Sequence, residues 1–599
     1  MGPGKIPGPL FEIGDKCMRK TKIICTLGPT TDRKDLLVNI IKAGLDLARF
    51  NFSHGSYEEC SKRIELLHEA ATEAGKIVGL VADTKGPEMR LGIFKNDKVT
   101  LKEGEPFCLT TDDVEGDEHI SHVNYNKLHE DVKPGDQILL NDGKLTLEVV
   151  KIDGTNINTK VIHGGEISSR KRVAVPGAIL KLPFMSEQDK ADITFAAKQH
   201  MDYVAASFVR NADDALEIRK LLEKLHSPMG IIAKIENQEG VDNIDAILDV
   251  VDGIMVARGD LGVEIPMEEV PIAQKVLIAK CNAKGKPVVT ATQMLESMIT
   301  NYRATRAEAS DVANAIFDGT DAIMLSGETA SGAYPLEAVQ TMAKLAERTE
   351  RALDYAKVFR QKGLGEQVNL TTAISHATVQ IAQELEANVI MPITESGMTA
   401  RMIAKYRPKA GVVAVSPNPV SLRRMTLYWG VSPLLGANTP NTDELITNSA
   451  KLAVDAGLVK KGDSVVVTAG MNVGKVGSTN LIKVINVGSE VVKGLGIGKR
   501  AVNGIICRVE STADLSKLTP SSIMLVTGIE NEMGKAASKV KGIIAEEGGF
   551  TSQAAIVGIN CGIPVIVGAQ GCMDKLKDGD EVTMDVRSGT VYEGKINVK

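Results

Sequence analysis

Three charged residues stand at the ends of two neighbouring strand-like runs in this 599-residue sequence. The run Gly230–Glu236 carries Lys234 and Glu236, which are two residues apart and therefore point to the same face of a strand. The next run, Gly253–Ala257, leads into Asp260. A lone lysine and glutamate at this spacing more often form a structural ion pair. Two carboxylates and a lysine at neighbouring strand ends indicate a site for a divalent metal and a phosphate.

These runs belong to a longer alternation of strands and helices. The strand candidates are Lys22–Thr26, Asp46–Asn51, Lys76–Asp83, Tyr203–Phe208, Gly230–Glu236, Gly253–Ala257, Pro287–Ala291 and Ala322–Ser326. Eight strands alternating with helices predict a closed, parallel (β/α)₈ TIM barrel, with its active site at the C-terminal ends of the strands. A helix around Arg303–Phe317 opens with a capping box of Thr305 and Glu308.

Polar residues follow most of these strands. They are Arg49, Asn51 and Ser53 at strand two, Asp83 and Thr84 at strand three, Ser207 at strand four and Thr292 at strand seven. Any one of them could simply cap a helix or close a turn. Their gathering at one rim of a barrel favours an active site.

Other units interrupt and follow the predicted barrel, which takes residues 18–87 and 184–355. Residues 88–183 lose helical periodicity and show hairpin signals such as Asn141-Asp-Gly143, which predicts an inserted β-rich domain, expected to be a β-barrel. Residues 356–487 predict an α/β domain, 488–500 a glycine-spaced linker, and 501–599 a further α/β domain that ends in a hairpin. Residues 1–17 predict an N-terminal extension or an artificial remnant, with no function assigned.

Composition narrows the class of protein. A formal net charge of −6 argues against a general nucleic-acid or membrane-surface binder. Eight scattered cysteines without a Cys-x-x-Cys pair indicate neither a zinc knuckle nor a disulfide framework, and fit the reducing cytoplasm. No apolar run approaches the roughly 18 residues of a membrane span. We therefore expect a cytoplasmic protein with no membrane partner.

Motifs along the barrel resemble those of the pyruvate kinase family. The matching segments are Lys22–Pro29, Ala48–Gly55, Asp83–Arg90, Ala206–Arg210, Lys234–Asn237, Met255–Glu264, Ala291–Met298 and Met324–Thr329. They follow the family's order, and the resemblance runs from Met18 to about Val487. It implies transfer of a phosphoryl group from phosphoenolpyruvate to ADP, giving pyruvate and ATP, the last step of glycolysis.

The resemblance also implies roles for the rim residues. Glu236 and Asp260 match the ligands of Mg²⁺ (or Mn²⁺), and Lys234 matches the catalytic lysine that stabilises the transfer and the enolate it leaves. Arg49 matches the catalytic arginine that holds the substrate phosphate. Gly259, Asp260 and Thr292 match positions that hold the substrate, and Thr292 lies near the carbon that gains a proton.

A second cation and the nucleotide are implied as well. Asn51, Ser53, Asp83 and Thr84 match the K⁺ ligands, all of them oxygen donors, and Glu88 fits potassium dependence. The matches to nucleotide-binding residues are Asn51, His54, Arg90 and Lys171. Because Lys171 lies in the inserted domain, we expect that domain to close over the site and exclude water.

The remaining resemblances concern regulation. Thr394, Ser396, Gly397 and Thr399 lie in a turn that matches the loop for a phosphorylated allosteric effector; from the residues alone, a capped helix start is an equally good interpretation. The family also implies a homotetramer. The stretch Glu547–Val557 resembles the phosphohistidine domain of phosphoenolpyruvate-utilising enzymes, with Gln553 where the phosphocarrier needs histidine, so we expect a structural or regulatory module.

Two other functions stay open at this point. Magnesium-dependent lyases or aldolases acting on pyruvate or phosphoenolpyruvate also place Glu and Asp at successive barrel strand ends. The monovalent-cation set and the lid favour a kinase over a lyase. A silent, effector-binding scaffold would have no need of the chemically active set Lys234, Glu236, Asp260, Arg49 and Thr292.

Overall fold

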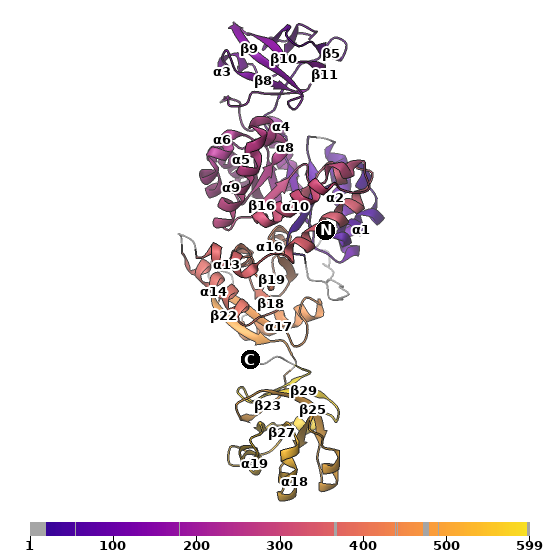
Figure 1. Ribbon diagram of the computed structural model, residues 1–599, viewed down its shortest axis with the longest axis vertical. Helices are drawn as coiled ribbons and strands as arrows, with labels where there is room; N and C mark the ends of the chain where they lie inside the picture. The colour runs from indigo at the N-terminus through magenta and orange to yellow at the C-terminus, as the bar shows by residue number, and fades with distance from the viewer. Residues whose placement is uncertain are drawn as a thin grey trace.

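The computed structural model describes residues 19–53, 55–178, 180–364, 368–437, 439, 441–470, 479–488 and 490–595. The predicted extension 1–17 lies outside these ranges. Four folded units follow one another along the long axis of the molecule, with the β-rich lid at one end and the C-terminal domain at the other (Figure 1). The barrel and the α/β domain lie between them.

Eight parallel strands close the predicted TIM barrel, three before the lid and five after it. In order around the barrel they are β1 (Lys22–Thr26), β2 (Leu47–Asn51), β3 (Gly79–Asp83), β13 (Tyr203–Ala206), β14 (Gly230–Ile235), β15 (Gly253–Ala257), β16 (Val288–Ala291) and β17 (Ala322–Leu325). Every strand residue except Asn51 is buried, because helices cover the outside and side chains fill the inside. The predicted fold class is confirmed.

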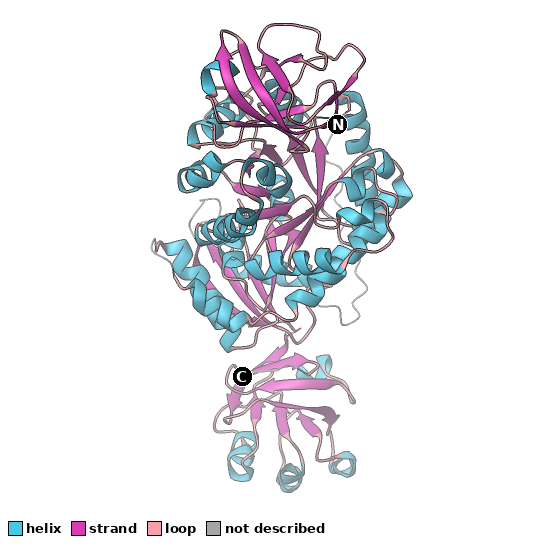
Figure 2. Ribbon diagram, turned by 45° about the horizontal axis from the view of Figure 1, so that its top comes forward, coloured by secondary structure: helices cyan, strands magenta, loops and turns pink. Residues whose placement is uncertain are grey.

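Helices surround the barrel strands (Figure 2). They are α1 (Lys34–Ala43), α2 (Tyr57–Ala74), α4 (Glu187–Lys198), α5 (Ala212–Lys224), α6 (Gln238–Asp242), α7 (Ile244–Val250), α8 (Arg258–Glu264), α9 (Val270–Ala283), α10 (Arg306–Asp318), α11 (Gly327–Ala330) and α12 (Pro335–Glu350), with short 3₁₀ turns at Pro29–Thr31, Met267–Glu269 and Glu296–Ile299. The predicted capping box opens α10. Glu308 N–H donates to Thr305 Oγ1 at 3.2 Å, and Thr305 N–H donates to Glu308 Oε2 at 2.7 Å.

Four aspartates line the N-terminal end of the barrel, each just before one of the alternate strands β2, β13, β15 and β17. Each accepts a hydrogen bond from a backbone N–H of the adjacent strand: Ile23 to Asp46 at 2.8 Å, Leu80 to Asp202 at 2.9 Å, Ile231 to Asp252 at 2.8 Å and Val288 to Asp321 at 2.9 Å. Each also pairs with an arginine, respectively Arg19, Arg423, Arg219 and Arg407, at 2.6 to 2.9 Å. Two of these arginines belong to the α/β domain, so the aspartates fix both the strands and the domain beneath them.

The inserted lid is almost entirely β-structure. Its larger sheet has the order β4 (Met89–Arg90), β12 (Arg172–Ala174), β8 (Gln137–Leu140), β9 (Leu145–Asp153), β10 (Asn156–His163), β6 (Pro106–Thr110) and β7 (Ile120–His122); β11 (Gly165–Ser168) pairs with β5 (Lys98–Leu101), and α3 spans Leu128–Asp131. The predicted hairpin joins β8 to β9, and φ is +51°, +58° and +80° at Asn141, Asp142 and Gly143. These left-handed conformations are what a tight hairpin needs and Asn, Asp and Gly tolerate.

A five-stranded α/β domain follows the barrel. Its sheet has the order β20 (Val431–Leu435), β19 (Gly411–Ser416), β18 (Val389–Pro392), β21 (Ser464–Gly470) and β22 (Thr479–Asn486), with α13 (Tyr355–Lys362), α14 (Leu370–Glu384), α15 (Met398–Lys405), α16 (Pro419–Met425) and α17 (Thr442–Asp455). One hydrophobic cluster runs from the barrel interior into this domain, including Tyr203 and Tyr406. Tyr203 also donates its hydroxyl hydrogen to the Arg424 carbonyl at 2.8 Å.

The C-terminal domain holds an eight-stranded mixed sheet. Its order is β23 (Glu490–Lys493), β30 (Thr590–Glu593), β29 (Glu581–Asp585), β25 (Val502–Arg508), β26 (Ser522–Val526), β27 (Gly542–Ala545), β28 (Val565–Val567) and β24 (Leu495–Ile497), with α18 (Asn531–Ala536), α19 (Gln553–Cys561), α20 (Cys572–Lys575) and 3₁₀ turns at Thr512–Lys517 and Ala537–Lys539. The predicted terminal hairpin is β29–β30.

The predicted linker 488–500 is wrong, because β23 and β24 form the two edges of this sheet. Its glycines allow close backbone contact rather than free movement. A Cβ at Gly496 would lie 1.9 Å from the Val586 carbonyl oxygen, and one at Gly494 would lie 2.5 Å from that of Val567. Glycine spacing in this segment therefore reports tight packing.

Two further findings concern membrane helices and cysteines in the described ranges. No helix within them is long and apolar enough to cross a membrane. The seven cysteines within them are all free thiols.

Candidate active site

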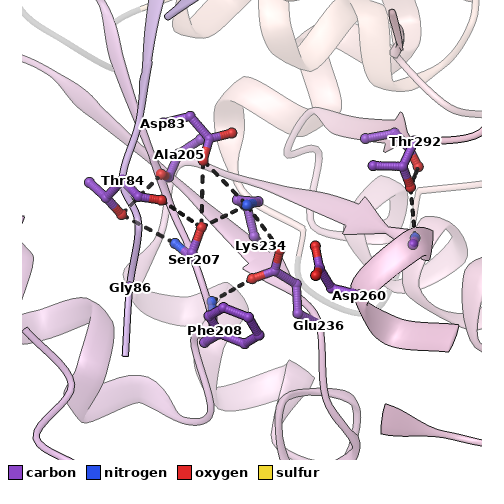
Figure 3. A network of polar contacts seen from close by, with 12 residues as sticks. Asp83, Thr84, Gly86, Ala205, Ser207, Phe208, Lys234, Glu236, Asp260 and Thr292 are labelled. Atoms are coloured by element: carbon purple, nitrogen blue, oxygen red, sulfur yellow. Dashed lines mark hydrogen bonds and ion pairs between the residues drawn. The ribbon is translucent and has the colours of Figure 1, made fainter. Parts of the chain in front are cut away.

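The charged residues first noted in the sequence meet at the C-terminal end of the barrel (Figure 3). Lys234 Nζ lies 2.9 Å from Glu236 Oε1, which is the predicted ion pair. The same ammonium lies 3.3 Å from Asp83 Oδ1 and donates to Ser207 Oγ at 2.6 Å. The carboxylates of Asp83 and Glu236 are almost wholly inaccessible to water, so three charges are buried together.

Lys234 is held in its charged form. Burial lowers the pKa of the ammonium, but Asp83 and Glu236 raise it by more, and the pKa lies above its ordinary value. A buried, permanently positive group cannot accept a proton from a substrate. It can stabilise negative charge that develops nearby, and does so more strongly here than in water.

Glu236 has spare capacity to bind a cation. Its Oε2 accepts the backbone N–H of Phe208 at 2.6 Å. Its buried Oε1 lies within ion-pair distance of Lys234, yet the angles of that contact give it no hydrogen bond. Burial raises the pKa of this carboxyl, and Lys234 offsets the rise only in part. The side chain of Asp260 lies beside Glu236 (Figure 3).

The pair Glu236 and Asp260 fits a magnesium ion. Mg²⁺ in phosphoryl-transfer sites takes one or two carboxylates and completes its shell with water and substrate oxygens. Within the described ranges, no group of three or more His, Cys, Asp or Glu side chains is arranged to hold a metal. Glu236 Oε1, which is ion-paired with Lys234 but has no hydrogen bond, is the atom that such an ion would contact.

Arg172, a site residue that comes from the lid, was missed in the sequence. Its Nη1 donates to Asp260 Oδ1, and its Nη2 lies 3.4 Å from Glu264 Oε1. The guanidinium carbon lies 4.8 Å from the centre of the Phe208 ring. The available signal was the basic run 170–172, of which only Lys171 was singled out.

Arg49 joins the same network from β2. Its Nε donates to Asp83 Oδ2 at 2.6 Å, and its Nη1 donates to Thr26 Oγ1 at 2.9 Å. Asp83 is thus held by two cations, Arg49 and Lys234. These contacts lower the pKa of Asp83, although burial alone would raise it.

The predicted potassium ligands lie at the ends of β2 and β3. Asn51 and Asp83 are direct partners across these strands. Asn51 Oδ1 accepts the Ser53 N–H at 3.1 Å, and the Thr84 N–H donates to the Ala205 carbonyl at 3.0 Å. The set offers carboxylate, amide and hydroxyl oxygens, which suits a hard monovalent cation.

Gly259 and Thr292 meet on the opposite side of the rim. The Gly259 N–H donates to Thr292 Oγ1 at 2.7 Å, and this hydroxyl donates to the Ala291 carbonyl at 2.6 Å (Figure 3). Thr292 and Gln293 have φ of +68° and +53°, a conformation that costs a β-branched residue about 1–3 kcal/mol. Arg258 supports the turn by donating to the Thr292 carbonyl at 2.8 Å.

The structure brings together only some of the predicted nucleotide-binding residues. Arg90 donates to Glu88 Oε2 through Nη2 at 2.6 Å and to the Arg170 carbonyl through Nη1 at 3.0 Å. The Lys171 carbonyl accepts the Leu91 N–H at 2.9 Å, which holds Lys171 beside the same segment. His54 lies outside the described residues.

The predicted effector turn precedes α15. Gly397 has φ of +79°, and its N–H donates to Thr394 Oγ1 at 3.1 Å. Ser396 Oγ accepts the Met398 N–H at 3.4 Å. The Thr399 hydroxyl is buried against Thr479 Oγ1 at 2.6 Å, so it is directed into the domain.

In the C-terminal domain, Gln553 is the first residue of α19 and its side chain is exposed. Ser552 caps this helix by accepting the Ala555 N–H at 3.4 Å. An amide lacks the basic nitrogen with which imidazole accepts a phosphoryl group.

Comparisons with known proteins decide the family. Residues 18–339 match the family model described as pyruvate kinase, barrel domain; 372–485 match pyruvate kinase, alpha/beta domain; and 518–589 match PEP-utilising enzyme, mobile domain. The pyruvate kinase of Bacillus licheniformis is 49% identical over 585 residues, which cover 97% of this chain and 100% of that protein. That of Geobacillus stearothermophilus is 49% identical over 587 residues, with the same coverage.

The chain belongs to the pyruvate kinase family. A crystal structure of a pyruvate kinase from Cryptosporidium parvum superposes with a TM-score of 0.75 at 39% identity, covering 78% of this chain and 96% of that one. As a pyruvate kinase, the enzyme transfers the phosphoryl group of phosphoenolpyruvate to ADP and gives pyruvate and ATP. This decides for the kinase against the lyase and scaffold alternatives.

Proposed function

We propose that Lys234, Arg49 and Thr292 carry the chemical step, with Glu236 and Asp260 as the ligands of Mg²⁺ or Mn²⁺. The observation that carries this proposal is the buried cluster in which Lys234 lies 2.9 Å from Glu236 and 3.3 Å from Asp83. When bound, the divalent ion would neutralise charge on the transferring phosphoryl group.

Each residue has a task suited to its chemistry. Arg49 binds phosphate oxygens through its planar, two-pronged guanidinium, for which it exchanges part of its contact with Asp83. Lys234 stabilises the enolate left when the phosphoryl group departs. Gly259, Asp260 and Thr292 surround the rest of the substrate, and the Thr292 hydroxyl lies on the side from which the enolate carbon is protonated.

Asn51, Ser53, Asp83 and Thr84 would hold K⁺, and Glu88 fits this requirement. The support is the partnership of Asn51 and Asp83 across β2 and β3, which brings oxygens of both strands together. Asn51, His54, Arg90 and Lys171 would contact the nucleotide. Closure of the lid over them would keep water from competing with ADP.

ATP formation from phosphoenolpyruvate and ADP tests the whole set. We expect full activity with Mg²⁺ and K⁺ together and a large loss when either ion is left out. Full activity without any monovalent cation would contradict the K⁺ site and the role of Glu88. Normal Mg²⁺ dependence in a Glu236→Gln variant would contradict the magnesium site.

The α/β domain carries the proposed regulatory site. Thr394, Ser396, Gly397 and Thr399 would form a site for a phosphorylated effector, which calorimetry with a sugar phosphate would test.

A homotetramer is supported by exposed apolar side chains on the barrel, where Met267, Ile272 and Phe317 are 82%, 56% and 52% exposed. Light scattering that gives a monomer would contradict it. A cytoplasmic location agrees with the free cysteines.

The C-terminal domain would serve as a structural or regulatory module. Its support is Gln553, which stands exposed at the position where a phosphocarrier needs histidine. Mass spectrometry of the enzyme during turnover is expected to find no phosphoryl group on residues 501–599; finding one would contradict this assignment.

A further inference from the structure

Arg172 connects the lid to the barrel's metal site. Its guanidinium is paired with Asp260 and lies 3.4 Å from Glu264, and both carboxylates belong to α8 of the barrel. The side chain of Arg172 is only 10% exposed, whereas that of Asp260 is 35% exposed. The cation is therefore buried, whereas the carboxylate that it contacts is partly open to solvent.

Arg172 is fixed at both of its ends. Its backbone lies in β12, where it is paired with Arg90, and its carbonyl accepts the Asn141 N–H at 3.0 Å. Its guanidinium stacks on the ring of Phe208, a favourable cation–π contact. The Phe208 N–H in turn donates to Glu236. The contact with Asp260 therefore ties the lid sheet to α8 of the barrel.

The guanidinium and a divalent ion compete for Asp260. Both are cations, and the guanidinium already neutralises, through Oδ1, the negative charge on which a metal at Asp260 would draw. The two positive charges would also repel each other across a few ångströms of partly desolvated space. Metal ligation by Asp260 and its contact with Arg172 therefore weaken each other.

We infer that Arg172 is a counter-ion carried by the lid, which neutralises Asp260 in the metal-free enzyme and opposes binding of the divalent ion, so that metal binding weakens the tether between the lid and α8. This inference rests on the proposed metal site of Glu236 and Asp260. Arg172 is accordingly a positioning residue: it sets how the lid responds to the metal and takes no part in the chemical step. Without the metal, the lid is tethered to α8.

Metal affinity of the substrate-free full chain tests this directly. Mn²⁺ is titrated into the protein, and the free ion is measured by its electron paramagnetic resonance signal. In Arg172→Ala the competitor is gone, and we expect Mn²⁺ to bind about fivefold more tightly than in the wild type, the effect of removing one partly exposed ion pair. Arg172→Lys keeps the charge but loses the two-pronged contact, so its affinity should fall between the two.

A matched control is Lys98→Ala. Lys98 lies in the same lid domain and pairs only with Glu166 of that domain, at 2.9 Å. Its removal changes the net charge by the same amount without touching the barrel, so Mn²⁺ affinity should stay at the wild-type value. Unchanged or weaker Mn²⁺ binding in Arg172→Ala, or equal tightening in Lys98→Ala, would overturn the inference.

Hydrogen exchange gives a second readout that does not depend on activity. In the wild type, Mn²⁺ should speed amide exchange in β12 and in the segment around Arg90. In Arg172→Ala, exchange should be fast without metal and change little when it is added. Metal-independent exchange in the wild type would contradict weakening of the tether by the metal.

The Asp260→Asn variant separates this inference from the proposed metal site. If Asp260→Asn binds Mn²⁺ as the wild type does, the metal site itself is wrong. If Asp260→Asn loses affinity while Arg172→Ala gains none, the metal site stands and only the role of Arg172 fails.

Discussion

At the N-terminal end of the barrel, Asp46, Asp202, Asp252 and Asp321 each accept a backbone N–H and each pair with an arginine. At the C-terminal end, Asp83 and Glu236 are buried and Asp260 is partly exposed, and these charged groups are incompletely matched. Glu236 Oε1 has no hydrogen bond, and Asp260 is neutralised by Arg172, which belongs to another domain. The backbone near this end also holds Phe208 and Thr292 at positive φ.

The two ends differ in whether the ion pairs leave carboxylate oxygens free to bind another group. A carboxylate whose oxygens are taken by a backbone N–H and an arginine can only hold the fold together. A carboxylate with an oxygen that has no hydrogen bond, or with an ion-pair partner that can move away, can bind a metal or a substrate. Variants at the two ends should therefore separate stability from turnover.

The largest expected effect is that of Lys234→Met at the C-terminal end. It removes the positive charge proposed to face the developing enolate, so kcat should fall by about 10³-fold or more. The fold should survive, because Asp83 keeps Arg49 and the raised pKa of Glu236 lets that carboxyl take up a proton. Steady-state kinetics and thermal unfolding of the same preparation measure both quantities.

A near-normal kcat in Lys234→Met with a large rise in KM for phosphoenolpyruvate would reassign Lys234 to substrate binding. A collapse of stability with no soluble protein would mean that the two ends do not differ as described. Lys234→Arg, which retains the charge with altered geometry, separates loss of charge from loss of fit.

The next effect is expected at the N-terminal end, in Arg407→Met. Arg407 donates to Asp321 at 2.8 Å, to Asn282 Oδ1 at 2.9 Å and to the Gly319 carbonyl at 2.7 Å, and it is 4% exposed. Its loss leaves Asp321 buried with no counter-charge, so the free energy of unfolding should fall by about 3 kcal/mol. The kcat of the folded enzyme should stay unchanged.

Urea unfolding followed by tryptophan fluorescence measures this locally. Trp429 is the only tryptophan of the chain, and its ring centre lies 4.9 Å from the Arg407 guanidinium. Arg360→Met, an exposed arginine of the same domain, is the control and should leave the midpoint in place. A lower kcat with unaltered unfolding in Arg407→Met would break the comparison.

The elements that position the site could be predicted from the sequence because each barrel strand is an apolar run that ends in a polar residue. The pairing of Lys234 with Glu236 followed from their spacing of two. Arg172 could not be found in this way, because its contact with Asp260 depends on how one domain docks on another, which no periodicity records. The segment 488–500 was misjudged because glycine favours both flexible linkers and close backbone contacts, and only the neighbouring strands decide between them.

The N-terminal aspartates also escaped notice. Each is visible in the sequence as an aspartate before an apolar run, but its partner N–H lies on a strand 20 or more residues away, and the register of that strand is needed to identify it. Two of them, Asp46 and Asp202, occupy equivalent positions in the barrel, yet the pKa of Asp46 is lowered and that of Asp202 is raised.

The smallest expected effect is a pH dependence of stability at this end. Burial raises the pKa of Asp202 to about 6, despite Arg423. Between about pH 4 and 6 the folded state therefore retains a proton that the unfolded state has released, and stability falls as the pH rises, by about 1.4 kcal/mol per unit and at most about 3 kcal/mol. The Asp202→Asn variant cannot titrate at this position. Its free energy of unfolding should therefore rise relative to that of the wild type as the pH increases through this window.

Asp46→Asn is the control for this measurement, because Arg19 and Lys22 lower the pKa of Asp46 even though burial opposes them. The stability that Asp46 contributes should be lost only as the pH falls below about 4, so the difference between Asp46→Asn and the wild type should stay flat between pH 4 and 6. Parallel slopes for the two variants would show that Arg423 holds Asp202 charged as firmly as Arg19 holds Asp46. In that case both aspartates would act as fixed ions, and the N-terminal end would differ from the catalytic end even more sharply.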